Sequence, residues 1–73
     1  MTYYLKAPDS KEIGKIIKNT RKELRVTQRK LALASGTGLR FIIELEQGKP
    51  TCQLEKTLTV LRTLGLQLII KGK

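Results

Sequence analysis

The 73-residue sequence contains no histidine and a single cysteine, Cys52. One cysteine excludes a disulfide within the chain, and a zinc site would lack its usual ligands. The same absences remove the commonest general base and any Ser-His or Cys-His nucleophile pair. We therefore predict a protein that is not an enzyme and that holds no metal ion or other cofactor. Cys52 itself is predicted to be a small, partly buried apolar residue.

Long apolar runs are also missing from the sequence. No segment approaches the ~18 apolar residues of a membrane span, and the chain does not open with a signal-peptide pattern. These absences predict a cytoplasmic protein without a membrane partner. A chain of 73 residues forms one small domain, and at this size good helix packing or a partner subunit is usually needed for stability.

Basic residues are in large excess over acidic ones. The chain has 15 Lys and Arg against 6 Asp and Glu, which is a formal net charge of +9. The excess is uneven, since residues 1–30 hold nine of the basic residues and three of the acidic ones. Such a surplus is typical of proteins that bind nucleic acid and predicts a nucleoid-associated protein. The alternatives are a Lys-rich solvated surface and, less favoured, a membrane-surface peptide.

The N-terminal part of the chain predicts an arm followed by an amphipathic helix. Residues 1–9 form the arm, which carries Tyr3 and Tyr4. Asp9 is the predicted N-cap of a helix that runs to about Arg25. Gly14 within this helix indicates close packing. Apolar positions recur at helical spacing along it, at Ile13, Ile16, Ile17, Thr20 and Leu24.

Three further helices and a strand are predicted beyond residue 26. Thr27 caps a helix from Gln28 to about Ser35, and Gly36 ends it in a left-handed conformation. A third helix opens at Thr37 or Gly38 and ends near Gln47 and Gly48. The fourth ends at Leu64, before Gly65, and presents Leu54, Leu58, Leu61 and Leu64 to the core or to a dimer interface. Residues 66–70 are too short and too β-branched for a helix and are predicted to form a strand.

A single strand on a helical domain leaves unpaired backbone groups. We expect it to pair with the same strand of a second subunit, which would bury Leu66, Leu68 and Ile70 at a two-fold interface. The alternatives are pairing with residues 3–5 of the same chain and a disordered tail. The predicted organisation is an arm (1–9), a helical domain (10–64) and a dimerisation strand (65–73).

The middle of the chain has the spacing of a helix-turn-helix. This motif requires a small residue where its two helices cross, a glycine in the turn and apolar residues in between. Ala32 and Gly36 meet the first two requirements, and Leu31, Ile42 and Leu45 meet the third. Together with Gln28 at the first position, these matches predict a helix-turn-helix domain.

The same stretch resembles the xenobiotic-response-element family of phage-repressor-type domains. The resemblance is carried by residues 26–32, Ser35-Gly36, Arg40-Phe41-Ile42, Leu45-Glu46 and Gly48-Lys49-Pro50. Within that family, residues 58–66 and the terminal strand are similar to HipB-like antitoxins. The resemblance implies an all-α, four-helix phage-repressor-like domain whose C-terminal strand pairs across a homodimer. It also implies a repressor of its own operon that binds a palindromic operator in double-stranded DNA and neutralises a HipA-type serine/threonine kinase toxin.

The residues expected to contact DNA follow from the resemblance. Gln28, beside Thr27 and Arg29, begins the second helix, where such domains contact the DNA backbone or a base edge. The third helix would enter the major groove, with Arg40 donating to a guanine and Lys49 binding phosphate. The full set of expected DNA-binding residues is Thr27, Gln28, Arg29, Thr37, Gly38, Leu39, Arg40, Ile43 and Lys49.

Some positions depart from the family pattern. Leu39 and Ile43 are apolar where polar residues are common, and they can only touch a thymine methyl group. Glu44 and Glu46 would repel phosphates if they faced them, and Glu46 is expected to be a helix-end or turn partner. Two alternatives therefore stay open. One is a protein-interaction subunit of a kinase complex with weak DNA binding, and the other is a solitary phage-type repressor.

Overall fold

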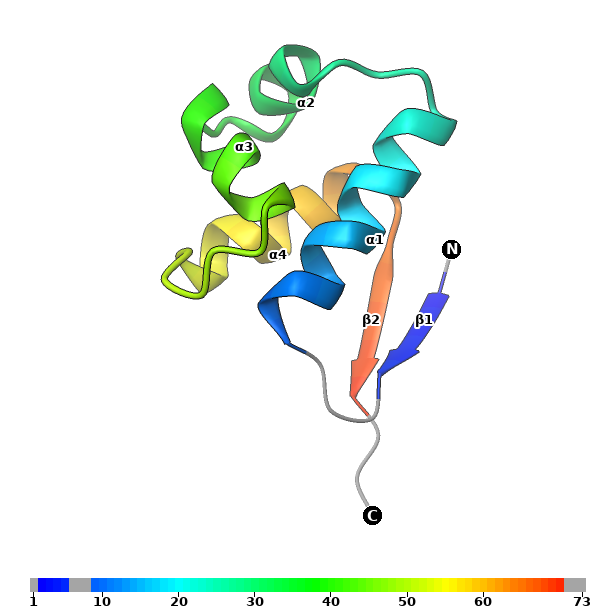
Figure 1. Cartoon of the computed structure of the whole chain (residues 1–73). Coiled ribbons are helices and arrows are strands. Elements are labelled where there is room, and N and C mark those ends of the chain that lie inside the picture. The colour runs from blue at the N-terminus through cyan, green and yellow to red at the C-terminus, as the bar shows by residue number, and fades with distance from the viewer. Residues whose placement is uncertain (1, 6–8, 71–73) are drawn as a thin grey trace.

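A computed structural model describes residues 2–5 and 9–70, with the backbone alone for residues 2–5 and 70 (Figure 1). Four helices lie between two short strands. In chain order the elements are β1 (Thr2–Leu5), α1 (Ser10–Glu23), α2 (Gln28–Ser35), α3 (Leu39–Glu46), α4 (Leu54–Thr63) and β2 (Gln67–Ile70). The four predicted helices and the C-terminal strand are confirmed. The rest of the predicted arm, residues 1 and 6–8, lies outside the described residues, as do residues 71–73 of the predicted dimerisation segment.

Two of the helices begin at the predicted caps. The Asp9 carboxylate accepts a hydrogen bond of 2.8 Å from the backbone N–H of Glu12. The Thr27 hydroxyl oxygen accepts one of 3.1 Å from the backbone N–H of Lys30. Each bond satisfies a donor that the first helical turn leaves without a partner. Helices α3 and α4 follow Gly38 and Gln53, and neither has a side-chain cap.

All four helices end in the same way. A residue with positive φ follows each helix, and the next residue donates its N–H back to the carbonyl five positions earlier. The positive-φ residues are Arg25, Gly36, Gly48 and Gly65, and the donor and acceptor pairs are Val26 to Arg21, Thr37 to Ala32, Lys49 to Glu44 and Leu66 to Leu61. The predicted left-handed conformation of Gly36 is confirmed. Helix α1 uses an arginine in this position, at φ 57°.

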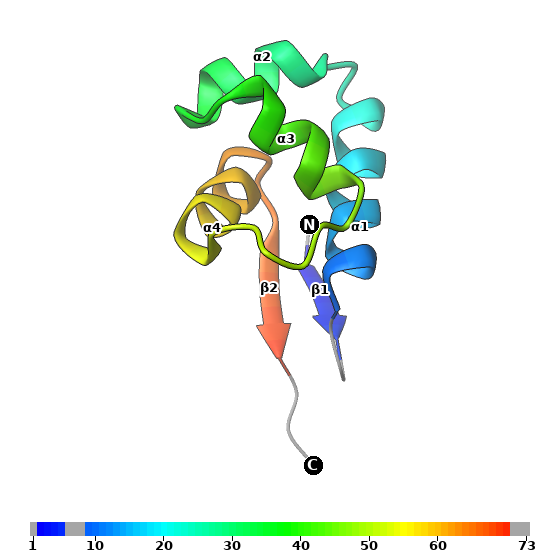
Figure 2. The same ribbon diagram turned by 60° about the vertical axis from the view of Figure 1, so that its left-hand side comes forward.

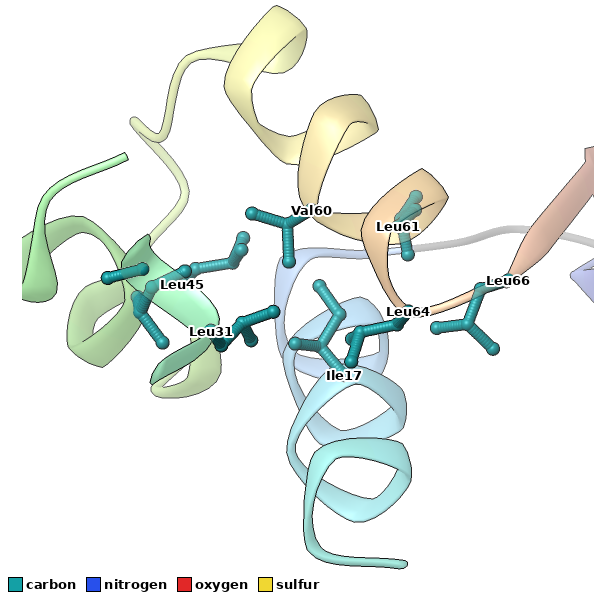
Figure 3. Packing of buried hydrophobic residues seen from close by; sticks show 9 residues of the cluster. Ile17, Leu31, Leu45, Val60, Leu61, Leu64 and Leu66 are labelled. Atoms are coloured by element: carbon teal, nitrogen blue, oxygen red, sulfur yellow. The ribbon is translucent and has the colours of Figure 1, made fainter. Parts of the chain in front are cut away.

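The core lies where the four helices meet. Figure 3 shows its side chains converging from all of them, with Leu66 extending the cluster toward β2. The buried apolar residues are Ile17, Leu31, Ala32, Ile42, Leu45, Val60, Leu61, Leu64 and Leu66. Two of the predicted apolar positions are exposed. Leu24 is 53% exposed because it follows the last turn of α1, and Leu54 is 69% exposed at the first position of α4.

Helices α1 and α3 cross closely at Gly14. This residue is buried, and a Cβ added there would press against the backbone carbonyl oxygens of Leu45 and Glu46. Glycine therefore lets the two helix backbones approach each other. The close packing predicted at this position is confirmed.

The two strands pair within the chain. β1 lies parallel to β2, with Thr2 opposite Gln67 and Leu5 opposite Ile70. This is the intramolecular alternative for the C-terminal strand, and pairing across a dimer remains a prediction. A parallel pair requires a long crossover, and here the whole helical domain forms it. Figures 1 and 2 both show the sheet at the end of the molecule opposite α2 and α3.

Candidate nucleic-acid interface

Helices α2 and α3 form the predicted helix-turn-helix. Leu31 and Ala32 of α2 pack with Ile42 and Leu45 of α3, and all four are buried. The turn between the helices is held by the Ser35 hydroxyl, which donates to the Leu31 carbonyl at 2.7 Å and lies 3.0 Å from the Thr37 hydroxyl. The packing of α2 against α3 therefore agrees with the helix-turn-helix predicted from the spacing of the apolar residues.

The outer face of α3 carries three of the predicted DNA-binding residues. The Arg40 side chain is 91% exposed, while Leu39 and Ile43 are half-buried. These three residues, together with Glu44 and Gln47, line one shallow hollow on the helix. Figure 2 shows α3 in front, with no other element covering this side in that view. The hollow thus combines apolar side chains with one exposed guanidinium.

Glu44 joins two of the predicted DNA-binding cations. Its Oε2 atom lies 3.0 Å from Nζ of Lys49 in the turn after α3 and 3.8 Å from Nε of Arg40 one helical turn earlier. The Glu44 side chain is 30% exposed. The i,i+4 spacing in the sequence places Glu44 beside Arg40, whereas the contact of Glu44 with Lys49 depends on the turn that follows α3.

The start of α2 presents the second group of predicted residues. Thr27 is exposed and its hydroxyl caps the helix. Arg29 is exposed, and so is its neighbour Lys30. Gln28 is half-buried, and its Nε2 donates to Oε1 of Glu46 at 3.0 Å. The side chain of Gln28 is therefore oriented by the last residue of α3.

Glu46 also forms a buried ion pair with Arg21 of α1. Arg21 Nε donates to Oε2 at 2.6 Å, Nη2 donates to Oε1 at 3.0 Å, and Nη1 donates to the Val26 carbonyl at 2.9 Å. The expectation that Glu46 is a helix-end partner is confirmed, and this carboxylate does not face a ligand. Arg21 was not predicted to have this role. The signal is its spacing, because Arg21 lies four residues after the buried Ile17 on the inner face of α1.

The N-terminus of α3 has an exposed backbone. Gly38 is exposed, and no atom lies within 4 Å of the position that a Cβ would occupy there. Thr37 is half-buried, with its hydroxyl beside that of Ser35. An incoming phosphate could therefore approach the first amides of α3, where the helix dipole favours an anion.

The residues expected at a dimer interface are found in different surroundings. Leu66 is 6% exposed within the core of its own chain. Leu68 is half-buried, and the side chain of Ile70 lies outside the described residues. A groove between α4 and β2 is lined by Leu58, Leu61, Arg62, Leu66, Gln67, Leu68 and Ile69. Leu66 therefore offers little surface to a partner, while Ile69 is 39% exposed.

Cys52 is half-buried and has a free thiol. Burial raises the pKa of this thiol, the Glu44 carboxylate raises it further, and Lys49 opposes both effects. Within residues 2–5 and 9–70, no three His, Cys, Asp or Glu residues gather as a metal site would require. No helix in the described part of the chain is long and apolar enough to cross a membrane.

Comparison with known proteins identifies a relative. No protein-family model matches the chain. The chain is similar to the "Uncharacterized HTH-type transcriptional regulator y4mF" of Sinorhizobium fredii. The two sequences are 49% identical over 59 residues, which cover 81% of this chain and 78% of the relative. With this identity and coverage, and with α2 and α3 arranged as a helix-turn-helix, the chain belongs to the family of HTH-type transcriptional regulators.

Proposed function

We propose that this protein binds a palindromic operator in double-stranded DNA as a homodimer and represses transcription. The outer face of α3 carries the proposal, because it presents Arg40 between the apolar Leu39 and Ile43. An α-helix with its side chains is about 10–12 Å wide, which matches the major groove of B-DNA at about 12 Å. The surplus of basic residues favours a polyanionic partner.

Each proposed contact has a chemical role. Arg40 donates two hydrogen bonds to a guanine, and Leu39 and Ile43 contact thymine methyl groups. Phosphates are bound by Arg29, Lys49 and the first amides of α3, after Thr37 and Gly38. At the start of α2, Thr27 and Gln28 lie beside the DNA strand whose phosphates Arg29 binds. The Gln28 amide is held in place because it donates to Glu46, which is itself paired with Arg21.

The proposed homodimer forms at the sheet end of the molecule. The groove between α4 and β2 is mostly apolar, and Leu68 and Ile69 extend it to the surface. A two-fold contact there would leave both α3 helices uncovered, because α3 lies at the other end (Figure 2). Two-fold symmetry in the protein then requires two half-sites in the DNA, separated by about one helical turn.

Fluorescence anisotropy on the DNA upstream of the protein's own gene tests the repressor proposal. A scrambled duplex is the comparison, and both are titrated at two salt concentrations. A preference of order 10³ for the native duplex is expected of a specific regulator. Equal binding to both duplexes, lost at the higher salt, would contradict the proposal.

Variants of the basic residues sharpen this test. Arg40→Lys keeps the charge but cannot form the two parallel hydrogen bonds, so it should reduce the preference for the native duplex. Lys49→Ala should weaken binding to both duplexes alike. Lys18→Ala, an exposed lysine on α1, is the matched control for the loss of one positive charge.

We also propose that the protein is the antitoxin partner of a HipA-type kinase and acts in the cytoplasm at the nucleoid. The resemblance of residues 58–66 to HipB-like antitoxins supports this part, and Leu33 of α2, 84% exposed, provides apolar surface outside the α3 hollow. Co-expression with a kinase encoded beside the gene should yield a complex on size-exclusion chromatography. Absence of a complex would contradict the antitoxin role and leave the repressor proposal standing.

A further inference from the structure

The acidic residue on the outer face of α3 requires an explanation. Glu44 lines the same hollow as Arg40 and Ile43, whereas Glu46, the other acidic residue of this helix, is buried against Arg21. A carboxylate on a surface that approaches DNA is repelled by the phosphates. The position of Glu44 is therefore unfavourable for DNA binding unless its carboxylate accepts a hydrogen bond from a donor in the complex.

The ion pairs of Glu44 are too weak to explain why a carboxylate lies on this face of α3. Glu44 lies 3.0 Å from Lys49 and 3.8 Å from Arg40, but the side chains are 47% and 91% exposed. Pairs of this kind typically contribute 0–1 kcal/mol, so they hold the surface together only weakly. Lys49 can contact a phosphate as well, since about half of its side chain is exposed.

We propose that Glu44 reads a cytosine in each half-site of the DNA, which rests on the proposed DNA-binding function. In the major groove, cytosine presents an amino donor and no acceptor of its own, so an acceptor lies on only one side of that donor, the O6 atom of the paired guanine. The amino group of adenine lies between two acceptors, its own N7 and the O4 atom of the paired thymine. A carboxylate only accepts hydrogen bonds. It is therefore satisfied by cytosine, opposed by the N7 atom of adenine, and repelled by the acceptors of guanine and thymine.

The spacing of the helix limits where this cytosine lies. Arg40 and Glu44 are one helical turn apart, about 6 Å along the axis at 1.5 Å per residue. Successive bases on one strand are about 3.4 Å apart. The cytosine read by Glu44 therefore lies within about two base pairs of the guanine read by Arg40. Half-sites that place another base there are disfavoured, because the carboxylate then faces a hydrogen-bond acceptor.

Selection of bound sequences from a randomised duplex library tests this role. The full-length wild-type protein should enrich cytosine at one position of each half-site by about tenfold or more. Glu44→Gln should change that position to adenine, because an amide side chain pairs with the N6 and N7 atoms. Glu44→Ala should lose the preference there and keep the preference for guanine opposite Arg40.

The matched control is Glu23→Gln. Glu23 is an exposed glutamate at the C-terminal end of α1, so the variant has the same change of side chain and charge outside the α3 hollow. It should raise affinity for all duplexes at most slightly and leave the selected bases unchanged. Circular dichroism at 222 nm confirms that each variant is folded.

Two results separate this inference from the proposed function. If Glu44→Gln and Glu44→Ala select the same bases as the wild type, Glu44 is only a surface ion-pair partner and the inference is wrong. If the wild type enriches no sequence at all, the proposed function itself fails, and the base-reading role of Glu44 fails with it.

Discussion

Arg21 and Glu46 show how strongly one pair of side chains constrains this small domain. Their side chains are 10% and 3% exposed, and they connect α1 to the end of α3. Glu46 in turn holds Gln28 at the start of α2. Since a buried charge without its partner retains its full desolvation penalty, each residue depends on the other. The pair therefore fixes the relative positions of α1, α2 and α3 behind the proposed DNA-binding face.

Removing one member of the pair should be strongly destabilising. We expect Arg21→Met or Glu46→Gln to lower the free energy of unfolding by roughly 3 kcal/mol, because the remaining group is buried unpaired. Urea denaturation followed by circular dichroism measures the loss. Lys22→Met is the control, since Lys22 is exposed on the next position of the same helix. Equal losses for Arg21→Met and Lys22→Met would show that the ion pair is unimportant.

Gly14 allows α1 and α3 to pack closely because it has no side chain. Alanine is favoured over glycine within a helix by about 1 kcal/mol, so Gly14→Ala would stabilise α1 on propensity alone. We expect the opposite, a lower melting temperature, because the new Cβ would displace the backbone of α3 at Leu45 and Glu46. Differential scanning calorimetry measures this shift. A melting temperature at or above that of the wild type would show that the helices can separate at little cost.

At the scale of the elements, the helix ends are the most regular feature. Four successive helices end with a positive-φ residue and the same backward hydrogen bond. Glycine adopts this conformation readily, whereas a residue with a Cβ is strained by about 1–2 kcal/mol. Arg25 is thus the one non-glycine residue in this position among the described parts of the chain.

Replacing Arg25 with glycine should stabilise the protein. We expect Arg25→Gly to raise the free energy of unfolding by about 0.5–1 kcal/mol, since relief of strain at φ 57° outweighs the greater chain entropy of glycine. The matched variant is Gly65→Ala at φ 73°, where the site is open and only the conformation opposes the change. Gly65→Ala should lose about 1 kcal/mol. Chemical denaturation of both proteins measures the two effects, and the same sign for both would contradict the argument.

The whole molecule separates its two proposed interfaces. The α2–α3 pair lies at one end and the two-stranded sheet at the other (Figure 1). β1 pairs with β2, so the first and last elements of the described structure are held side by side although the whole helical domain separates them in sequence. A domain of this size buries little surface, and the sheet should therefore contribute to global stability.

Disrupting β1 should weaken the fold without unfolding the helices. Replacing residues 2–5 with a Gly-Ser sequence removes a strand of high β-propensity, and we expect a loss of about 1 kcal/mol. A domain of 60–100 residues would then melt about 4–8 °C lower. Circular dichroism at 222 nm should be unchanged at 20 °C. An unaltered melting temperature would mean that the pairing of β1 with β2 contributes nothing.

The local pattern determined most of the secondary structure and the helix-turn-helix. Caps, glycines and apolar spacing act over a few residues, so Asp9, Thr27, Gly36 and the core positions of α2 and α3 were all predictable. The same spacing places Leu39, Arg40 and Ile43 on one face of a helix. These features depend only on backbone geometry and on which residues avoid water.

Contacts between distant residues were decided by the tertiary structure alone. The partner of Arg21 lies 25 residues away, and the partner strand of β2 is at the other end of the chain. Glu44 lies beside Arg40 through the i,i+4 spacing of α3, which the sequence does specify, whereas Lys49 reaches Glu44 only because the turn after α3 folds back toward the helix. No short-range preference specifies such pairings, because they form only when packing brings the elements together. The sequence by itself thus determined the helices and the reading face, and packing decided how the charges behind that face are paired.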